Sequence, residues 1–219
     1  MKFGIRIILA SIGFLCYHFS YSQVTEGRII YDISYPGNTF DSVMKKNLPV
    51  QCVAYFNADK MRMDMSMGAG VLNSVIVDNV LQEVHVLMDM SGHKTDFFMT
   101  RKDIEREEKG KGTYKILKSD DVSVIAGYNC KKATAELSEG NSYTVWYTND
   151  IKVNNSNWNN QFRDIDGFLM EFTMNQGVLT MAMRARKVFP EKVSQEIFQV
   201  PAGYQPVSGS DLKKMMEGR

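Results

Sequence analysis

Alternation of apolar and polar residues is the feature that most constrains the fold, because it recurs in short segments along most of the chain. Side chains of a β-strand point alternately to the two faces of a sheet, so a period of two predicts strands with one buried face. Clusters of Gly, Asn, Asp and Ser separate the segments, as tight turns require. Short strands joined this way predict an antiparallel sheet. The predicted strands are 27–35, 50–57, 60–67, 71–78, 83–90, 93–99, 113–118, 122–137, 142–148, 168–175 and 178–188.

Three predicted hairpins can be registered from their turns, at Gly68–Gly70, Ser91-Gly92 and Gln176-Gly177. Glycine in each turn supplies the positive φ that such turns require. A slip by one residue would send every side chain to the wrong face, so the pattern fixes which face each residue occupies. The expected pairs are Met61–Val77, Met63–Val75 and Met67–Val71; Val84–Met99, Val86–Phe97 and Met88–Thr95; and Phe168–Ala185, Met170–Met183, Phe172–Met181 and Met174–Leu179.

The registered hairpins predict a sheet with one apolar face, rich in methionine and aromatic residues, and one charged face. In the first hairpin the charged face carries Lys60, Arg62, Asp64 and Ser66. We expect these side chains in solvent, so that Arg62→Ala has little effect on stability. The apolar face must be buried against something. We therefore predict a mainly β fold: a curved antiparallel sheet that forms an unclosed half-barrel with a few covering helices.

Few segments have helical signals. Thr100 and Asp103 form a capping-box pattern that predicts a helix reaching about Glu108. Ser210 can cap a terminal helix over 211–217, and a short helix over 41–47 is left open. The stretch 154–166 is a polar loop that carries Trp158 and Phe162.

The first 22 residues have the pattern of a secretory signal peptide. Lys2 and Arg6 precede an apolar run, and small residues at Ser20 and Ser22 predict a cut between Ser22 and Gln23. The run is short for a retained membrane anchor, which is the alternative interpretation. A lipid anchor on Cys16 would need a small residue before it, and Leu15 stands there. We expect a periplasmic or secreted protein with no stable membrane anchor and one domain over 23–219.

Charge and cysteine content exclude several function classes. Lysine and arginine total 26 against 25 acidic residues, so the basic excess of a nucleic-acid-binding protein is missing. Beyond the leader the cysteines are Cys52 and Cys130, which do not form a C-x-x-C redox motif. Whether they form a disulfide stays open at this point.

Methionine is the compositional anomaly, with 15 residues in the chain. Methionine side chains are flexible and suit a surface that must fit ligands of variable shape. We therefore expect a non-enzymatic protein that binds a lipid, an acyl chain, a lipoprotein or another apolar ligand. The alternative is a structural or partner-binding envelope protein with a closed core. The residues expected to line the cavity are Met61, Met63, Met65, Val86, Phe97, Met170, Phe172, Met174, Met181 and Met183.

Metal binding and catalysis find less support. The thioethers of the run from Met61 to Met67 favour Cu(I), but alternate residues of a strand lie about 7 Å apart, too far to share an ion. The sequence also lacks a G-x-S-x-G or H-E-x-x-H motif. We expect no metal, no cofactor and no catalytic residues.

Several segments resemble a family of exported bacterial proteins classified as a domain of unknown function (DUF4412). The family looks similar in fold to the periplasmic lipoprotein carriers (LolA/LolB-like), which are unclosed antiparallel barrels with helices over an apolar hollow. The resemblance implies this fold and carries over no functional residue. The matching segments are 27–35, 59–67, 125–133, 145–151, 165–168 and 197–204.

Overall fold

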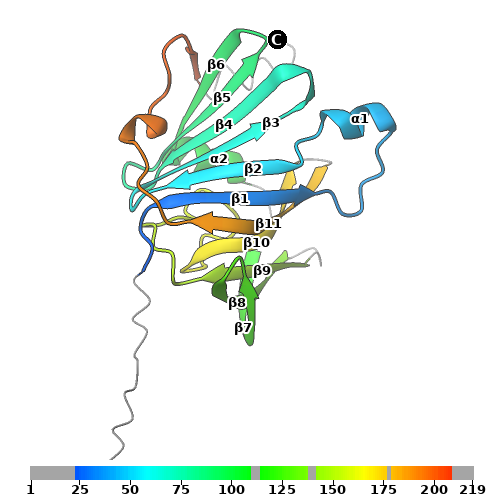
Figure 1. The fold of residues 1–219 in the computed structure, drawn as a ribbon, viewed down its shortest axis with the longest axis vertical. Helices are drawn as coiled ribbons and strands as arrows, with labels where there is room; N and C mark the ends of the chain where they lie inside the picture. The colour runs from blue at the N-terminus through cyan, green and yellow to red at the C-terminus, as the bar shows by residue number, and fades with distance from the viewer. Residues whose placement is uncertain (1–22, 110–113, 138–141, 177–178, 209–219) are drawn as a thin grey trace, which may run out of the picture.

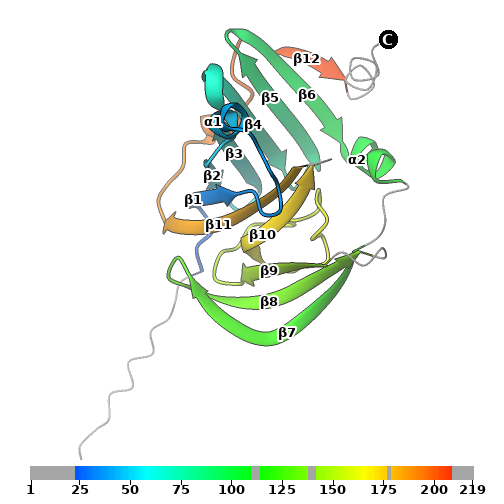
Figure 2. The same ribbon diagram turned by 90° about the vertical axis from the view of Figure 1, so that its right-hand side faces the viewer.

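In the computed structural model, twelve strands form one sheet that curls without closing (Figures 1 and 2). The structure describes residues 23–109, 114–137, 142–176 and 179–208. The strands are β1 (Gly27–Ser34), β2 (Gln51–Phe56), β3 (Lys60–Ser66), β4 (Val71–Asp78), β5 (Glu83–Met90), β6 (His93–Thr100), β7 (Tyr114–Ile125), β8 (Tyr128–Leu137), β9 (Ser142–Thr148), β10 (Phe168–Gln176), β11 (Leu179–Phe189) and β12 (Gln205–Ser208). The helices are α1 (Ser42–Asn47) and α2 (Arg101–Glu108), with short 3-10 turns η1 (Gly68–Gly70) and η2 (Gln195–Phe198).

Two antiparallel meanders meet in the middle of the sheet. The strand order is β12-β6-β5-β4-β3-β2-β1-β11-β10-β9-β8-β7, so β1 lies between β2 and β11. The edge strands β12 and β7 end up at opposite extremes of the curl (Figure 2). The predicted fold class, a mainly β unclosed sheet with few helices, is confirmed. Strand β12, which pairs parallel to β6, was not predicted because four residues are too short to show a period.

Two of the three predicted hairpin registers are confirmed. Met63 pairs with Val75, and Val86 pairs with Phe97. The third register is wrong by two residues, because Phe172 pairs with Met183 and not with Met181. An even shift leaves each side chain on its expected face, which is why the apolar pattern could not detect the error. Residues 177–178 of the predicted turn lie outside the described residues.

The predicted boundary between the seventh and eighth strands is wrong. Strand β7 continues to Ile125, and β8 begins at Tyr128 after a tight turn. In that turn Ala126 and Gly127 have φ angles of +50° and +87°. The polar residues 119–121, taken as a break, lie in a bulge within β7. Polar residues fit there because a bulge leaves residues of an edge strand unpaired and in solvent.

The helix signals are confirmed where the structure describes them. Helix α2 begins at the predicted capping box, where the amide N and the Oγ1 of Thr100 donate to Asp103 Oδ2 over 3.0 and 2.6 Å. Helix α1 forms the short helix that was left open, and Asp41 Oδ1 accepts from the first amides of that helix. The terminal helix predicted over 211–217 lies outside the described residues.

Candidate functional site

The main hydrophobic cluster occupies the concave side of the sheet and gathers eight of the ten predicted site residues. Met170, Phe172, Met181 and Met183 are buried, and the others are partly buried and packed against them. Phe97 is buried and Val86 partly buried. Both belong to the row Met63–Val75–Val86–Phe97, so they share this face, but they lie outside the main cluster. The partly buried predicted residues of the main cluster are Met61, Met63, Met65 and Met174.

Aromatic side chains order the centre of this cluster. The Phe172 ring meets Tyr31 edge-on, with centroids 6.0 Å apart, and meets Phe162 in the same way at 6.0 Å. Such edge-to-face pairs are a favoured aromatic geometry. The Tyr31 hydroxyl donates to the Leu169 carbonyl over 2.8 Å. Burial raises the pKa of Tyr31 well above its ordinary value, so the phenol stays neutral.

Cys52 and Cys130 are both buried, and both are free thiols, which answers the open question of the disulfide. Burial raises the pKa of Cys52 to about 12, and the Asp64 carboxylate adds to the rise. Burial likewise raises the pKa of Cys130 to about 11. Because the thiolate is the nucleophile, neither cysteine is reactive at neutral pH.

The segment 152–167 closes part of the concave side with two buried apolar side chains, Phe162 and Ile165. Phe162 is fully buried in the cluster, although most of its neighbours in the segment are polar. Side-chain amides fix the loop: Asn157 Nδ2 donates to the carbonyls of Ile165 and Gly167 over 2.8 and 2.9 Å, and Gln161 Nε2 donates to the Thr173 carbonyl over 3.0 Å. The sequence analysis predicted the loop but missed this role. The signal for it was a lone phenylalanine within a run of asparagines.

The same loop contributes to two pockets. The larger, of about 320 Å³, lies within the loop itself and is lined largely by polar residues. The smaller, of about 220 Å³, lies between the loop and α2. Trp158, Arg163 and Asp164 line both, and Arg163 is paired with Glu108 of α2. The indole Nε1 of Trp158 is buried and has no hydrogen-bond partner among the described residues.

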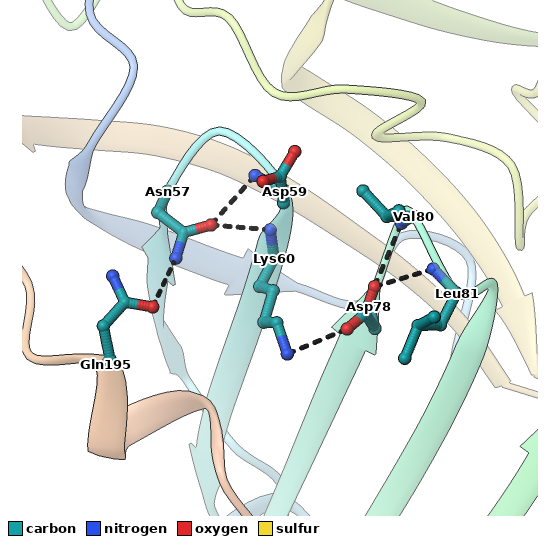
Figure 3. Close-up of polar contacts among 7 residues, drawn as sticks. All are labelled: Asn57, Asp59, Lys60, Asp78, Val80, Leu81 and Gln195. Carbon is teal, nitrogen blue, oxygen red and sulfur yellow. Dashed lines mark hydrogen bonds and ion pairs between the residues drawn. The ribbon is translucent and has the colours of Figure 1, made fainter.

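The turns beside this loop are held by short polar contacts (Figure 3). Lys60 Nζ lies 2.8 Å from Asp78 Oδ2, while Asp78 Oδ1 accepts from the amides of Val80 and Leu81 over 3.0 and 2.8 Å. Burial alone would raise the pKa of Asp78, but the hydrogen bonds and the Lys60 charge together outweigh it and hold the pKa below its ordinary value. These contacts fix the backbone of the turn, while its tip, Val80 and Leu81, is exposed. A hydrogen bond from Asn154 Nδ2 to Asp59 Oδ1, over 2.8 Å, links the turn between β2 and β3 to the loop.

The outer face of the first hairpin is not a free solvent face, contrary to the prediction. The Arg62 side chain is 12% exposed, with Nε 2.8 Å from Asp64 Oδ1, and it donates to the Ile197 carbonyl over 3.0 Å and to Ser74 Oγ over 3.3 Å. The segment around η2 covers this face and buries Phe198. The prediction failed because alternation along a strand cannot show that a distant segment packs on its polar side.

Side chains arranged to bind a metal or to catalyse a reaction are sparse among the described residues. Nowhere in the described ranges do three or more His, Cys, Asp or Glu side chains come close enough together to hold a metal ion. The same part of the chain contains no helix long and apolar enough to span a membrane. His85 Nδ1 lies 2.9 Å from Asp96 Oδ2 on the covered outer face, and neither residue lines either pocket.

Comparisons with known proteins give a family and a fold. Residues 81–203, more than half of the chain, match the model of the family "N-glycanase peptide, N-terminal domain" (PNGase F-II). The chain belongs to this family. No curated protein matches the sequence. The expected resemblance to DUF4412 stays a prediction.

Two solved structures share the fold of this N-glycanase-type N-terminal domain. The structure of PNGF-II has 18% sequence identity and a TM-score of 0.52, over 84% of this chain and 31% of that one. An uncharacterised conserved protein from Thermus thermophilus has 8% identity and a TM-score of 0.50, over 85% of this chain and 92% of that one. The present chain thus spans less than a third of the PNGF-II chain. At these identities the likeness concerns the fold alone.

Proposed function

We propose that this chain is an exported, non-catalytic binding domain whose concave face takes up an apolar ligand, such as a lipid or an acyl chain. The ligand would lie on the methionine and aromatic side chains of the main cluster. Binding there would be dispersive and would scale with the apolar area removed from water, at about 25 cal/mol per Å². The role needs no catalytic residue and no cofactor.

The observation that carries the proposal is the position of Phe162. This ring comes from a polar loop, is fully buried, and meets Phe172 edge-on at 6.0 Å. The loop buries this ring together with Ile165 and is held by a few hydrogen bonds from amide side chains. Lifting the loop would vacate the volume of one phenyl ring beside buried methionines. An apolar ligand could then replace the ring and keep the interior dry.

The rest of the concave face supports the same proposal. Met61, Met63 and Met65 are only partly buried, and Val86 continues the row on the next hairpin. Methionine is among the residue types most often fully buried, so a row of partly buried methionines leaves apolar surface that a ligand could cover. The partly buried methionines extend the same apolar face with adaptable side chains.

Uptake of cis-parinaric acid, followed by its fluorescence, tests the proposal. Phe162→Ala should raise the affinity about 10- to 150-fold, because the ligand no longer competes with a ring whose burial contributes about 1.5–3 kcal/mol. Phe198→Ala is the matched control, since that ring is also buried but lies on the outer face. Thermal melts identify the temperature range in which both variants are folded. Equal uptake by the two variants, or no saturable uptake by any form, would overturn the proposal.

Export is the second part of the proposal and rests on the leader sequence. The signal peptide predicts a mature chain that begins at Gln23. N-terminal sequencing of protein from the cell envelope and the culture medium tests this directly. A chain that retains its leader in the cytoplasm contradicts it.

The larger pocket favours a second candidate function, the binding of a carbohydrate. Its lining combines the indole of Trp158 with the amides of Asn149 and Asn155 and the carboxylate of Asp164. Amides and carboxylates pair with sugar hydroxyls, and an indole packs on the apolar face of a sugar ring. The volume of about 320 Å³ lies at the lower end of the range of ligand sites. Membership of a family named for an N-glycanase agrees with this ligand class.

Calorimetric titration with an N-glycosylated peptide and its unglycosylated counterpart tests the second candidate. We expect heat of binding only from the glycosylated peptide, lost in Trp158→Ala and retained in Trp146→Ala, because Trp146 lies on β9 and lines neither pocket. Equal binding of both peptides, or of neither, contradicts a carbohydrate site.

A further inference from the structure

Helix α1 and its flanks expose apolar side chains in a molecule whose other apolar residues are mostly covered. Val43 is 68% exposed, Met44 is 50% exposed, and Val50, three residues beyond the helix, is 68% exposed. None of the residues of α1 is buried. The helix stands out from the end of the sheet at which β1 ends and β2 begins (Figure 1).

The charge of this protrusion is positive. Lys45 and Lys46 lie in the last turn of the helix and form no ion pair within the described part of the chain. Asp41 is the only acidic residue between Tyr35 and Val50, and its carboxylate is engaged in capping the helix, accepting from the amides of Val43 and Met44 over 2.9 and 2.7 Å. The patch therefore offers two free cations beside its apolar side chains.

Apolar and basic side chains lie side by side on this exposed helix. Successive residues turn by about 100°, so Val43 and Lys46, three residues apart, are neighbours on the helix surface, and Met44 and Lys45 adjoin them. Lysines beside apolar groups suit a segment at a lipid interface, because the lysines can reach the headgroups while the apolar groups enter the acyl boundary.

We propose that the α1 protrusion, meaning residues 41–50, docks on a lipid surface that carries anionic headgroups. Charge decides between this partner and a second copy of the chain. Two copies meeting through this patch would bring four lysines together without a free carboxylate, whereas an anionic bilayer neutralises them. The proposal does not depend on whether the interior takes a ligand.

The framework around the protrusion holds it in place. The Tyr35 hydroxyl donates to the Pro49 carbonyl over 2.8 Å, and its ring meets Phe40 edge-on with centroids 5.8 Å apart. Asn38 Nδ2 donates to the Thr180 carbonyl of β11 over 2.9 Å. Substitutions of the exposed α1 side chains leave all of these contacts intact, so they can be tested without unfolding the protein.

Co-sedimentation of the processed protein with vesicles tests the proposal. The probes are vesicles of phosphatidylcholine alone and of phosphatidylcholine mixed equally with phosphatidylglycerol. We expect binding to the mixed vesicles that weakens with added salt. Lys45→Gln with Lys46→Gln should weaken the binding about 25-fold, because each lysine near an anionic surface raises the affinity about fivefold. Val43→Asp with Met44→Asp should abolish it.

A matched control lies on the exposed edge strand β7. Val122 is 75% exposed and Lys118 is exposed. Val122→Asp with Lys118→Gln therefore removes an exposed apolar side chain and lowers the net charge by two, as the α1 variants do, but away from α1. This control should bind vesicles like the unaltered protein. Equal loss in the control, or no vesicle binding by the unaltered protein, would overturn the proposal. So would concentration-dependent dimers in sedimentation velocity that Val43→Asp abolishes, because these would assign the patch to a second copy.

Discussion

The outer-face arginine gives the sharpest test of how the chain is held together. Arg62→Ala removes hydrogen bonds to Asp64, to Ser74 and to the Ile197 carbonyl, from a side chain that is 12% exposed. The bonds of a charged, largely buried group contribute about 1.5–3 kcal/mol, and the partners left behind lose theirs. Discounting for the partial exposure of Asp64, we expect a loss of about 3 kcal/mol in the free energy of unfolding.

Urea unfolding followed by tryptophan fluorescence measures this loss. With a slope of about 2 kcal/mol per molar urea, the midpoint should fall by about 1.5 M. Arg186→Ala is the control, because Arg186 is 49% exposed and lies 3.7 Å from Asp32. That exposed pair should contribute no more than about 0.5 kcal/mol. If the two variants unfold at the same urea concentration, the account of the covered outer face is wrong.

Three further predictions concern the interior and the turns. Met63→Lys should lower the stability by about 2–4 kcal/mol in the same assay, because a lysine on the apolar face must bury its charge or displace its neighbours; an unchanged midpoint would place Met63 in solvent. Cys52 and Cys130 should react with Ellman's reagent at pH 8 only after unfolding, since their pKa values are raised to about 12 and 11; two thiols missing even from the unfolded chain would reveal a disulfide. The folded-state pKa of Asp78 is lowered, so its ionised form stabilises the fold above the unfolded pKa of about 3.9, and this contribution is lost as the pH falls through the folded value. Asp78→Asn should therefore destabilise at pH 7 and have little effect near pH 2, and a loss independent of pH would contradict the lowered pKa.

Local pairing was predictable from the sequence because it depends on neighbouring segments and one turn. The Met61–Val77 and Val86–Phe97 pairs follow from alternation plus a glycine turn, and both are present. The register of β10 and β11 failed by two residues because an even shift changes no face. Nothing in the local pattern distinguishes these alternatives.

Contacts between distant segments were beyond the sequence analysis. The cover over Arg62 comes from Ile197, more than a hundred residues later in the chain. The insertion of Phe162 likewise depends on where a long loop returns to the sheet. Among the predicted site residues, Val86 and Phe97 share the face but not the main cluster, because the curl of the sheet carries them away from it. Which face a residue occupies is a local property, whereas what lies across from it is set by the whole fold.

The central position of β1 has a consequence for how the protein is made. Its second neighbour, β11, begins only at Leu179, so the first meander can form well before that partner arrives, whether the chain leaves a ribosome or emerges from export. Throughout this interval a nascent first meander would present the edge of β1 to any other strand it encounters. A substitution that delays β11 should therefore cause aggregation through β1, even when the finished protein is as stable as the original.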